Sequence, residues 1–380
     1  MTSNRTVPRL EHKATRRDLY MSFELGDKHW LITIGDGRHG VSRYTLVSGD
    51  TDAVADCIVK AGARFGTGAR ARVHSCYEAG RDGWWLHRWL TELGIDNIVV
   101  DAASIDVNRR ARRAKTDRID GDKLQSLLVR HHAGEHVWSV LREPSPEDED
   151  ARRVHRELQR LTHERIAHTN RIGSLLVLHN LRPRIVIGGR DWAAWWKSHR
   201  EQVPPLLQAE IERQVARLKL VKEQDKAVEK ARRKELAEDK QPMVASLARL
   251  RGIGLKGAWV LVKEVFGWRH FSNRRELASS LGLVPTPYAS GDSEIEQGIS
   301  KAGNRRVRAL LVEQAWSWLR LQPASPLTQW FERRFARGGL RMRRVGIVAV
   351  ARRLVIALWR YVSEGEIPAG ASLKRSTAPA

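Results

Sequence analysis

The feature that most constrains the fold is a series of three β-type runs between Leu19 and Leu46. The runs LYMSFEL, HWLITIG and SRYTLV are separated by glycine and aspartate turns, a pattern that predicts a meander of antiparallel strands. Helical and β-type patterns then alternate. We expect a helix over 52–64, a strand over 71–77, a helix over 82–93 and a strand over 97–100. This order predicts an α/β domain over about 17–140.

The same order is that of the ribonuclease H-like (RuvC-like) fold, in which phosphate-cutting carboxylates lie at strand ends and on the last helix. Glu24 ends the first strand, Glu78 ends the fourth, and Asp117 and Asp120 share one face of the helix that starts in AKTDRIDGDKL. Converging carboxylates suit two magnesium ions, which can activate an attacking oxygen and stabilise a leaving one. A single acid is more often a solvated surface charge, but the four together predict a metal site.

The charge of the chain indicates a polyanionic partner. Lys and Arg number 67 against 44 acids, which gives a net charge of +23. Hydrophobic residues at 42% and 14 tryptophans favour buried cores over a charged tail. A basic run that precedes Asp117 is interpreted as a contact to phosphates, although such a run is also typical of a solvated loop. It comprises Arg109, Arg110, Arg112, Arg113, Lys115 and Arg118.

Cysteine content and hydropathy exclude two classes of protein. Cys57 and Cys76 are the only cysteines and lack a CxxC spacing, so neither a disulfide framework nor a cysteine zinc site is expected. The longest apolar stretch, 345–359, is interrupted by Arg352 and Arg353, and no membrane span is expected. A cytoplasmic protein associated with the nucleoid fits both features.

Helical patterns dominate the rest of the chain. Apolar residues recur at roughly heptad spacing after Pro144 and again over about 206–236, which predicts a coiled-coil helical hairpin or a dimerising coiled coil over 145–240. The tryptophan-rich connection at 192–196 is interpreted as packing of the hairpin tip. A small helical domain is expected over 243–364 and a disordered tail over 365–380.

The glycines of LARLRGIGLKGAWVLVKEV have the GxGxxG spacing of a dinucleotide site. That fingerprint needs a preceding strand, whereas 243–251 has a helical pattern. Helix, glycine turn and helix predict a helix-hairpin-helix instead, whose turn, at Gly252 and Gly254, would hold a DNA phosphate. Residues 301–360 carry fourteen Lys and Arg against two Glu, and we expect nucleic acid to bind there. Most aromatic residues of this stretch are interpreted as core because they recur at helical spacing.

The segment LGLVPTPYASGDSEIEQGISKAGNRRVRALLVEQAW, together with CYEAGRDG around Glu78 and KTDRID, resembles the DEDD transposases of the insertion-sequence 110 family. The resemblance covers nearly the whole chain. It implies an enzyme that excises and inserts its own mobile element, guided by a bridge RNA that pairs with donor and target DNA. The family's first acid is usually aspartate, so Glu24 is a departure, and Asp27 is the alternative ligand.

The resemblance also implies a serine nucleophile, which corresponds to Ser290, with Ser293 and Ser300 as rivals. A phosphoserine intermediate would conserve the energy of the broken phosphodiester for rejoining. The nucleic-acid contacts expected beside it are Lys301, Asn304, Arg305, Arg306 and Arg308.

The acids and the serine lie far apart in the sequence, so we expect a homo-oligomer, a dimer or tetramer, in which subunits complete the active site. Two alternatives stay open. A RuvC-like, metal-dependent, structure-specific endonuclease would use the same acids without a serine. A catalytically inactive nucleic-acid-binding relative is supported only by the departure at Glu24.

Overall fold

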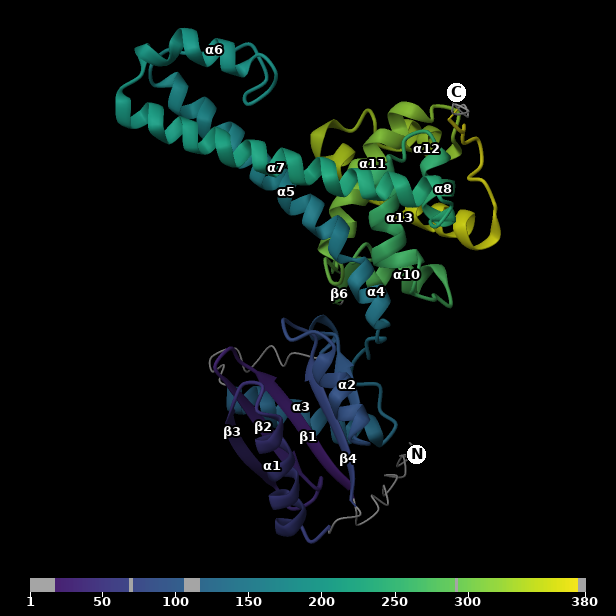
Figure 1. Ribbon diagram of the computed structural model, residues 1–380. Coiled ribbons are helices and arrows are strands. Elements are labelled where there is room, and N and C mark those ends of the chain that lie inside the picture. The colour runs from purple at the N-terminus through teal and green to yellow at the C-terminus, as the bar shows by residue number, and fades with distance from the viewer. Residues whose placement is uncertain (1–17, 68–70, 106–116, 291–292, 375–380) are drawn as a thin grey trace. The chain divides into compact units, whose positions relative to one another are not determined.

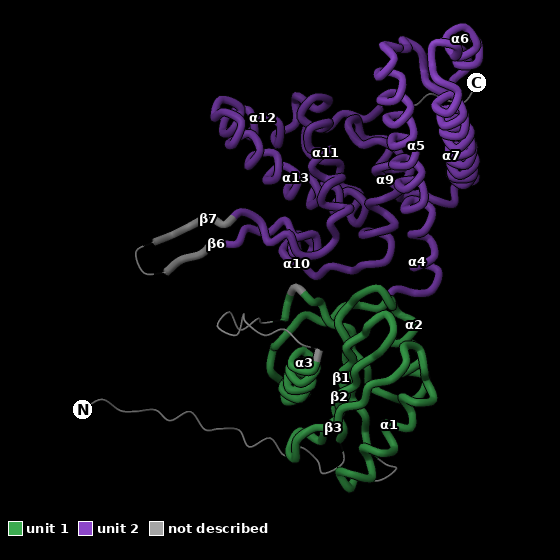
Figure 2. The backbone as a smooth tube through the Cα atoms, turned by 90° about the vertical axis from the view of Figure 1, so that its left-hand side faces the viewer, with its two compact units in different colours: residues 1–143 green, residues 144–380 purple. Residues whose placement is uncertain are grey.

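The computed structural model describes residues 18–67, 71–105, 117–290 and 293–374. The chain divides into two compact units, Met1–Glu143 and Pro144–Ala380, shown in separate colours in Figure 2. None of the described helices is both long and apolar enough to cross a bilayer.

A five-stranded mixed sheet forms the centre of the first unit (Figure 1). Its strands are β1 (Asp18–Leu25), β2 (His29–Gly35), β3 (Val41–Val47), β4 (Arg72–Glu78) and β5 (Asp96–Val100). Their order is β3-β2-β1-β4-β5, in which β1, β2 and β3 pair antiparallel and β1, β4 and β5 pair parallel. The predicted meander and both later strands are confirmed, and β4 extends one residue beyond its expected end.

Helices cover both faces of this sheet because each face has its own apolar set. Leu19, Met21 and Phe23 of β1 pack in one buried cluster with α1 (Thr51–Arg64) and α2 (Trp85–Glu92). Alternation along the strand sends Tyr20 to the other face, where it packs with Leu124 and Leu128 of α3 (Asp117–His132). A short 3₁₀ helix, η1 (Ala102–Ser104), follows β5.

The second unit begins with a helical hairpin. After α4 (Pro146–Ala151), α5 (Arg153–Val177) packs along α7 (Pro205–Ala237), and α6 (Trp192–His199) and η3 (Arg200–Gln202) connect them (Figure 1). Ile172 and Leu176 of α5 and Leu218 of α7 are fully buried in their shared core. Trp192 and Trp196 are buried in the same cluster, so the tryptophans pack the tip as expected.

A helical core completes the second unit. Its helices are α8 (Pro242–Arg249), α9 (Leu255–Leu261), the π-helical η4 (Val262–Phe266), α10 (Arg274–Ser280), α11 (Arg305–Leu321), α12 (Pro326–Arg334) and α13 (Gly339–Glu364). Trp318 and Phe331 are buried in this core, as the helical spacing of the aromatic residues predicted. The sequence did not predict the hairpin of β6 (Pro285–Ser290) and β7 (Ser293–Ile299).

A disordered tail was predicted from residue 365, and this prediction is wrong for the part of the tail that the structure describes. Leu373 forms a β-bridge with Leu250, and the Arg251 amide donates to the Ser372 carbonyl. Lys374 Nζ donates to the carbonyl oxygens of Ala248 and Ile253 at 2.6 and 2.9 Å. These backbone contacts fix a polar segment whose composition alone indicates no structure.

Candidate active site

Two of the predicted acids lie side by side at one edge of the sheet. β1 and β4 run parallel, with Phe23 opposite Tyr77, so Glu24 and Glu78 are the next neighbours in register. Alternation points both side chains to the face that α3 covers. Glu24 is half-buried and Glu78 is exposed. The carboxyl ends of two parallel strands thus bring two carboxylates together.

Helix α3 runs antiparallel to these strands, and this direction places its first turn at the same edge. Its last residue, His132, packs against His74 near the start of β4, with 3.9 Å between the ring centroids and 44° between the ring planes. Farther along the strands, the Ser22 hydroxyl donates a 2.8 Å hydrogen bond to the carbonyl of Gly121. The residues before Gly121 therefore lie toward the end of β1 that carries Glu24.

Asp117 and Asp120 belong to that first turn. Asp117 is the first residue of α3, and its side chain lies outside the described residues. Asp120 is half-buried. The backbone thus brings all four predicted acids to one edge of the sheet.

A glycine permits the close approach of α3 to the sheet. A Cβ on Gly121 would lie 2.8 Å from Thr33 Oγ1, closer than two such atoms can pack. Arg43 of β3 also ties the helix to the sheet, because its Nε and Nη2 atoms donate to Asp122 at 2.7 and 2.6 Å. The roles of Gly121 and Asp122 were not predicted, although both belong to the DGD sequence that begins at the predicted acid Asp120.

The other candidates of the first unit divide into two groups. Asp27, the alternative ligand, is exposed and forms a 2.6 Å ion pair with Arg81. The predicted cations Arg109, Arg110, Arg112, Arg113 and Lys115 lie outside the described residues.

Ser290 is the last residue of β6, opposite Ser293 at the start of β7, and its side chain lies outside the described residues. The rival Ser300 follows β7, and its amide donates to the Val284 carbonyl. The candidate nucleophile is therefore on a β-hairpin of the second unit.

The glycine turn connects two helices, α8 and α9, so the strand that a dinucleotide site requires does not precede it. Gly252 has a φ of +91°, and a Cβ there would lie 3.3 Å from Trp318 Cα. A Cβ on Gly257 would meet the amide of Gln314, whereas one on Gly254 would meet open space. Turn geometry and helix packing thus explain two of the three glycines without a ligand.

Two of the residues after position 300 that were expected to contact nucleic acid form hydrogen bonds within the protein. Asn304 caps α11 by accepting from the amides of Arg306 and Val307. Arg308 Nη1 donates to the carbonyl oxygens of Leu281 and Ala302 at 2.9 and 3.0 Å. Lys301 and Arg305 are exposed.

A buried carboxylate holds this region together. Glu264 is 2% exposed and accepts from His155 Nε2 at 2.7 Å, from Arg156 Nε and Nη2 at 2.9 and 3.0 Å, and from Asn304 Nδ2 at 3.0 Å. Burial alone raises its pKa, but the hydrogen bonds from His155 and Arg156 outweigh burial and hold the pKa well below its usual range. Glu264 therefore joins α5 to the cap of α11 as a carboxylate.

An arginine-lined cavity of about 710 Å³ lies over α10 and α13. Its lining contains five arginines, none of which forms an ion pair with a described carboxylate, and no described acid lines it. The Arg353 guanidinium lies 3.8 Å from the ring centroid of Trp330. We call this cavity the arginine pocket, defined by Arg274, Arg275, Trp330, Arg352, Arg353 and Arg360. One feature of the sequence could have indicated this pocket: Arg352 and Arg353 interrupt the apolar stretch 345–359.

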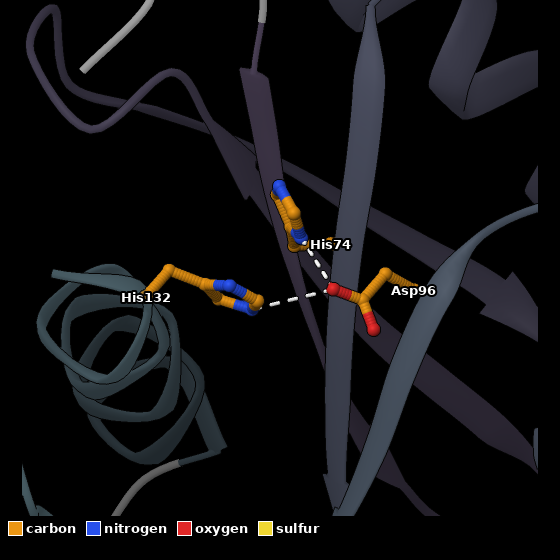
Figure 3. A group of neighbouring side chains, drawn as sticks. All are labelled: His74, Asp96 and His132. Atoms are coloured by element: carbon orange, nitrogen blue, oxygen red, sulfur yellow. Dashed lines mark hydrogen bonds and ion pairs between the residues drawn. The ribbon is translucent and has the colours of Figure 1, made fainter. Parts of the chain in front are cut away.

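A second group of potential metal ligands lies at the opposite end of β4. His74, Asp96 and His132 place their ligand atoms within 4.8 Å of one another (Figure 3). Burial, followed by the neighbouring His74, lowers the pKa of His132 to about 4. No sequence motif marks this group, because its members come from three separate elements.

Comparison with known proteins identifies relatives along nearly the whole chain. Residues 244–328 match the model of the transposase IS116/IS110/IS902 family. The protein y4rJ of Sinorhizobium fredii, which is named as a transposase, is 40% identical over 94% of both chains. The transposase for insertion sequence element IS1328 of Yersinia enterocolitica is 27% identical over 59% of this chain and 66% of its own length.

Proposed function

Since this chain belongs to the IS116/IS110/IS902 family of transposases, enzymes that cut DNA and transfer its strands, we propose that it uses two kinds of chemical group. The carboxylates of Glu24, Glu78, Asp117 and Asp120 hold two magnesium ions in a ribonuclease H-like unit. The hydroxyl of Ser290 attacks the DNA backbone. A structured bridge RNA selects donor and target DNA.

The observation that carries this proposal is the shared edge of β1, β4 and α3. Glu24 and Glu78 are neighbours in register on the face that α3 covers, and the antiparallel course of α3 directs its first turn to them. Strand order β3-β2-β1-β4-β5 with helices on both faces supports the ribonuclease H-like assignment.

The donor set fits magnesium because it consists of carboxylate oxygens, the hard ligands that this ion prefers. When bound, two such ions would polarise the scissile phosphate and stabilise the leaving oxygen. The half-buried Glu24 replaces the family's usual aspartate with a side chain one methylene longer, which can still present a carboxylate at the edge. Without cations, carboxylates gathered here would repel one another.

In the proposed step, Ser290 Oγ forms a bond to phosphorus and loses its proton to a base. The bond between phosphorus and the leaving backbone oxygen breaks, and that oxygen takes up a proton. The phosphoserine ester keeps the free energy of the broken phosphodiester, so reversal by another strand's hydroxyl rejoins DNA without an external energy source.

Nucleic-acid binding is assigned to cationic surfaces of the second unit. The five guanidiniums of the arginine pocket, together with the exposed Lys301 and Arg305, offer charge-assisted hydrogen bonds to phosphates. We propose that this surface contacts the backbone of DNA or of the bridge RNA, and that the enzyme works as a homo-oligomer.

A strand-cleavage assay tests the metal assignment. The substrate is DNA carrying both ends of the element that encodes the chain, with RNA transcribed from its flanks, in the presence of magnesium. Glu78→Gln and Asp120→Asn should each reduce cleavage on the order of 100-fold or more while leaving DNA binding intact. Asp122→Asn is the matched control, since this aspartate of the same helix pairs with Arg43. Unchanged cleavage in Glu78→Gln would show that the carboxylates are not the metal ligands.

A further inference from the structure

We propose that His74, Asp96 and His132 bind a transition-metal ion of the zinc class, at a site separate from the magnesium carboxylates. His74 is in β4, Asp96 is the first residue of β5, and His132 is the last residue of α3. Figure 3 shows both imidazoles directed toward the same carboxylate oxygen, so the three elements meet at one point.

The distances are close to those of a coordination shell. Asp96 Oδ2 lies 2.9 Å from His74 Nδ1 and 4.0 Å from His132 Nε2. Zinc bonds of about 2.0–2.2 Å in a tetrahedron place the ligand atoms roughly 3.3–3.5 Å apart. Small rotations of the exposed Asp96 side chain and of the two rings would therefore close the shell.

An unsatisfied nitrogen supports a bound cation. His132 Nε2 is buried and has no hydrogen-bond partner among the described residues. Such a buried polar atom costs free energy unless it is paired. A metal ion would accept its lone pair and would also attract the carboxylate of Asp96, satisfying both groups.

The donor chemistry selects the metal class. Two imidazoles and one carboxylate are a ligand set that zinc and its neighbours accept, whereas magnesium prefers oxygen ligands and retains waters. Tyr20 stacks on His74 with 5.3 Å between ring centroids, which orients that ring. The side chain of Asp96 is 60% exposed, so water can occupy a fourth position.

The location indicates a structural role for the ion. His74 and Glu78 are four residues apart on β4, or about 13 Å along an extended strand, so one ion cannot bind both. An ion at the triad would fasten the last residue of α3 to β4 and β5. Because α3 carries Asp117 and Asp120 in its first turn, such an ion would stabilise the helix that presents these acids.

Cobalt(II) substitution of the untagged full-length protein tests the site, because four-coordinate cobalt gives visible ligand-field bands that magnesium cannot give. We expect one equivalent of cobalt to produce these bands and one equivalent of zinc to abolish them. Asp96→Asn and His132→Ala should each weaken binding at least about 10-fold. Zinc should raise the Tm of the parent protein but not that of the folded Asp96→Asn variant.

Two controls separate this site from the others. His131→Ala removes the neighbouring histidine, and Asp120→Asn removes a proposed magnesium ligand, and both variants should keep the cobalt bands. Failure of Asp120→Asn to cut DNA would thus leave the triad result intact. Absence of a saturable signal in the parent, or identical bands in Asp96→Asn and His132→Ala, would overturn the proposal.

Discussion

At the scale of single residues, Gly121 determines how closely α3 approaches the sheet. A Cβ would lie 2.8 Å from Thr33 Oγ1, and the Thr33 side chain is buried and β-branched, so it cannot move aside. Alanine ordinarily favours a helix over glycine, but here the added methyl must displace the helix. We predict that Gly121→Ala lowers the free energy of unfolding by about 1–3 kcal/mol, measured by urea denaturation.

A matched pair of variants distinguishes overpacking from helix propensity. Gly173 in α5 has open space at its Cβ position, so Gly173→Ala should be neutral or stabilise by about 0.5–1 kcal/mol. Adding Thr33→Ala to Gly121→Ala should recover part of the loss because it removes the clashing oxygen. A Gly121→Ala protein as stable as the parent would contradict the observed packing.

Glu264 gives the second unit a predictable response to acid. Its pKa is lowered in the folded chain, whereas an unfolded glutamate titrates near ~4.3. The stabilisation is therefore fully present above that value and is lost as pH falls below it. Glu264→Gln should cost about 1.5–3 kcal/mol at pH 7, the range for hydrogen bonds to a charged group, and should flatten the stability profile between about pH 5 and 3.

Urea denaturation at several pH values measures this effect. Glu332→Gln is the control because Glu332 is an exposed glutamate of α12, and its profile should keep the slope of the parent. Equal slopes in Glu264→Gln and the parent would show that Glu264 is not the group that responds.

At the scale of elements, α10, α12 and α13 form the arginine pocket. Each phosphate contact that is lost reduces the dependence of log affinity on log salt by about 1. Arg352→Gln with Arg360→Gln should therefore weaken DNA or RNA binding and reduce the salt slope by about 2, measured by filter binding across salt concentrations. These two arginines are chosen because Arg353 also packs on Trp330.

A charge of the hairpin provides the comparison for that experiment. Arg217 is exposed on α7 and lies outside the pocket. Arg217→Gln should therefore change the salt slope by less than about 0.5. A double variant in the pocket that binds like Arg217→Gln would contradict its assignment as a phosphate surface.

The elements also show what periodicity can and cannot predict. Alternating apolar residues and glycine turns were sufficient to predict the five strands and their succession along the chain, because each strand buries a face. The position of each strand in the sheet was expected only from the match to the ribonuclease H-like fold. The β6–β7 hairpin was not predicted, because its strands, PTPYAS and SEIEQGI, are rich in proline and polar residues and lack a clear apolar alternation. The ordered segment up to Lys374 was missed because its partners, such as the carbonyl of Ala248, are distant in sequence.

The same reasoning applies to the candidate site. Glu24 and Glu78 were predictable from their places at strand ends, and the structure puts them in adjacent strands. The His74–Asp96–His132 group and the arginine pocket join residues from separate elements without a common sequence motif. The role of Ser290 as nucleophile was predicted from the family resemblance alone, because a serine near glycines is ordinarily a turn residue.

At the scale of the whole molecule, the proposed chemistry is divided between two units, each with its own buried core. The first contains the carboxylate edge, and the second contains the hairpin of Ser290 and the arginine pocket. If the metal ions activated water and no serine took part, the enzyme would be a nuclease that hydrolyses DNA. Both groups together account for cutting followed by rejoining, which a transposase must perform.

Quantifying the covalent protein–DNA species on a denaturing gel tests directly whether the serine and the carboxylates act in one reaction. Labelled element DNA is incubated with RNA transcribed from the flanks of the element, magnesium, and either the parent, Ser290→Ala or Glu78→Gln. We expect a protein-linked DNA band in the parent and none in either variant, and Ser293→Ala should retain the band. A band that persists in Ser290→Ala, or cleavage by the parent without any linked species, would contradict the assignment of Ser290 as the nucleophile.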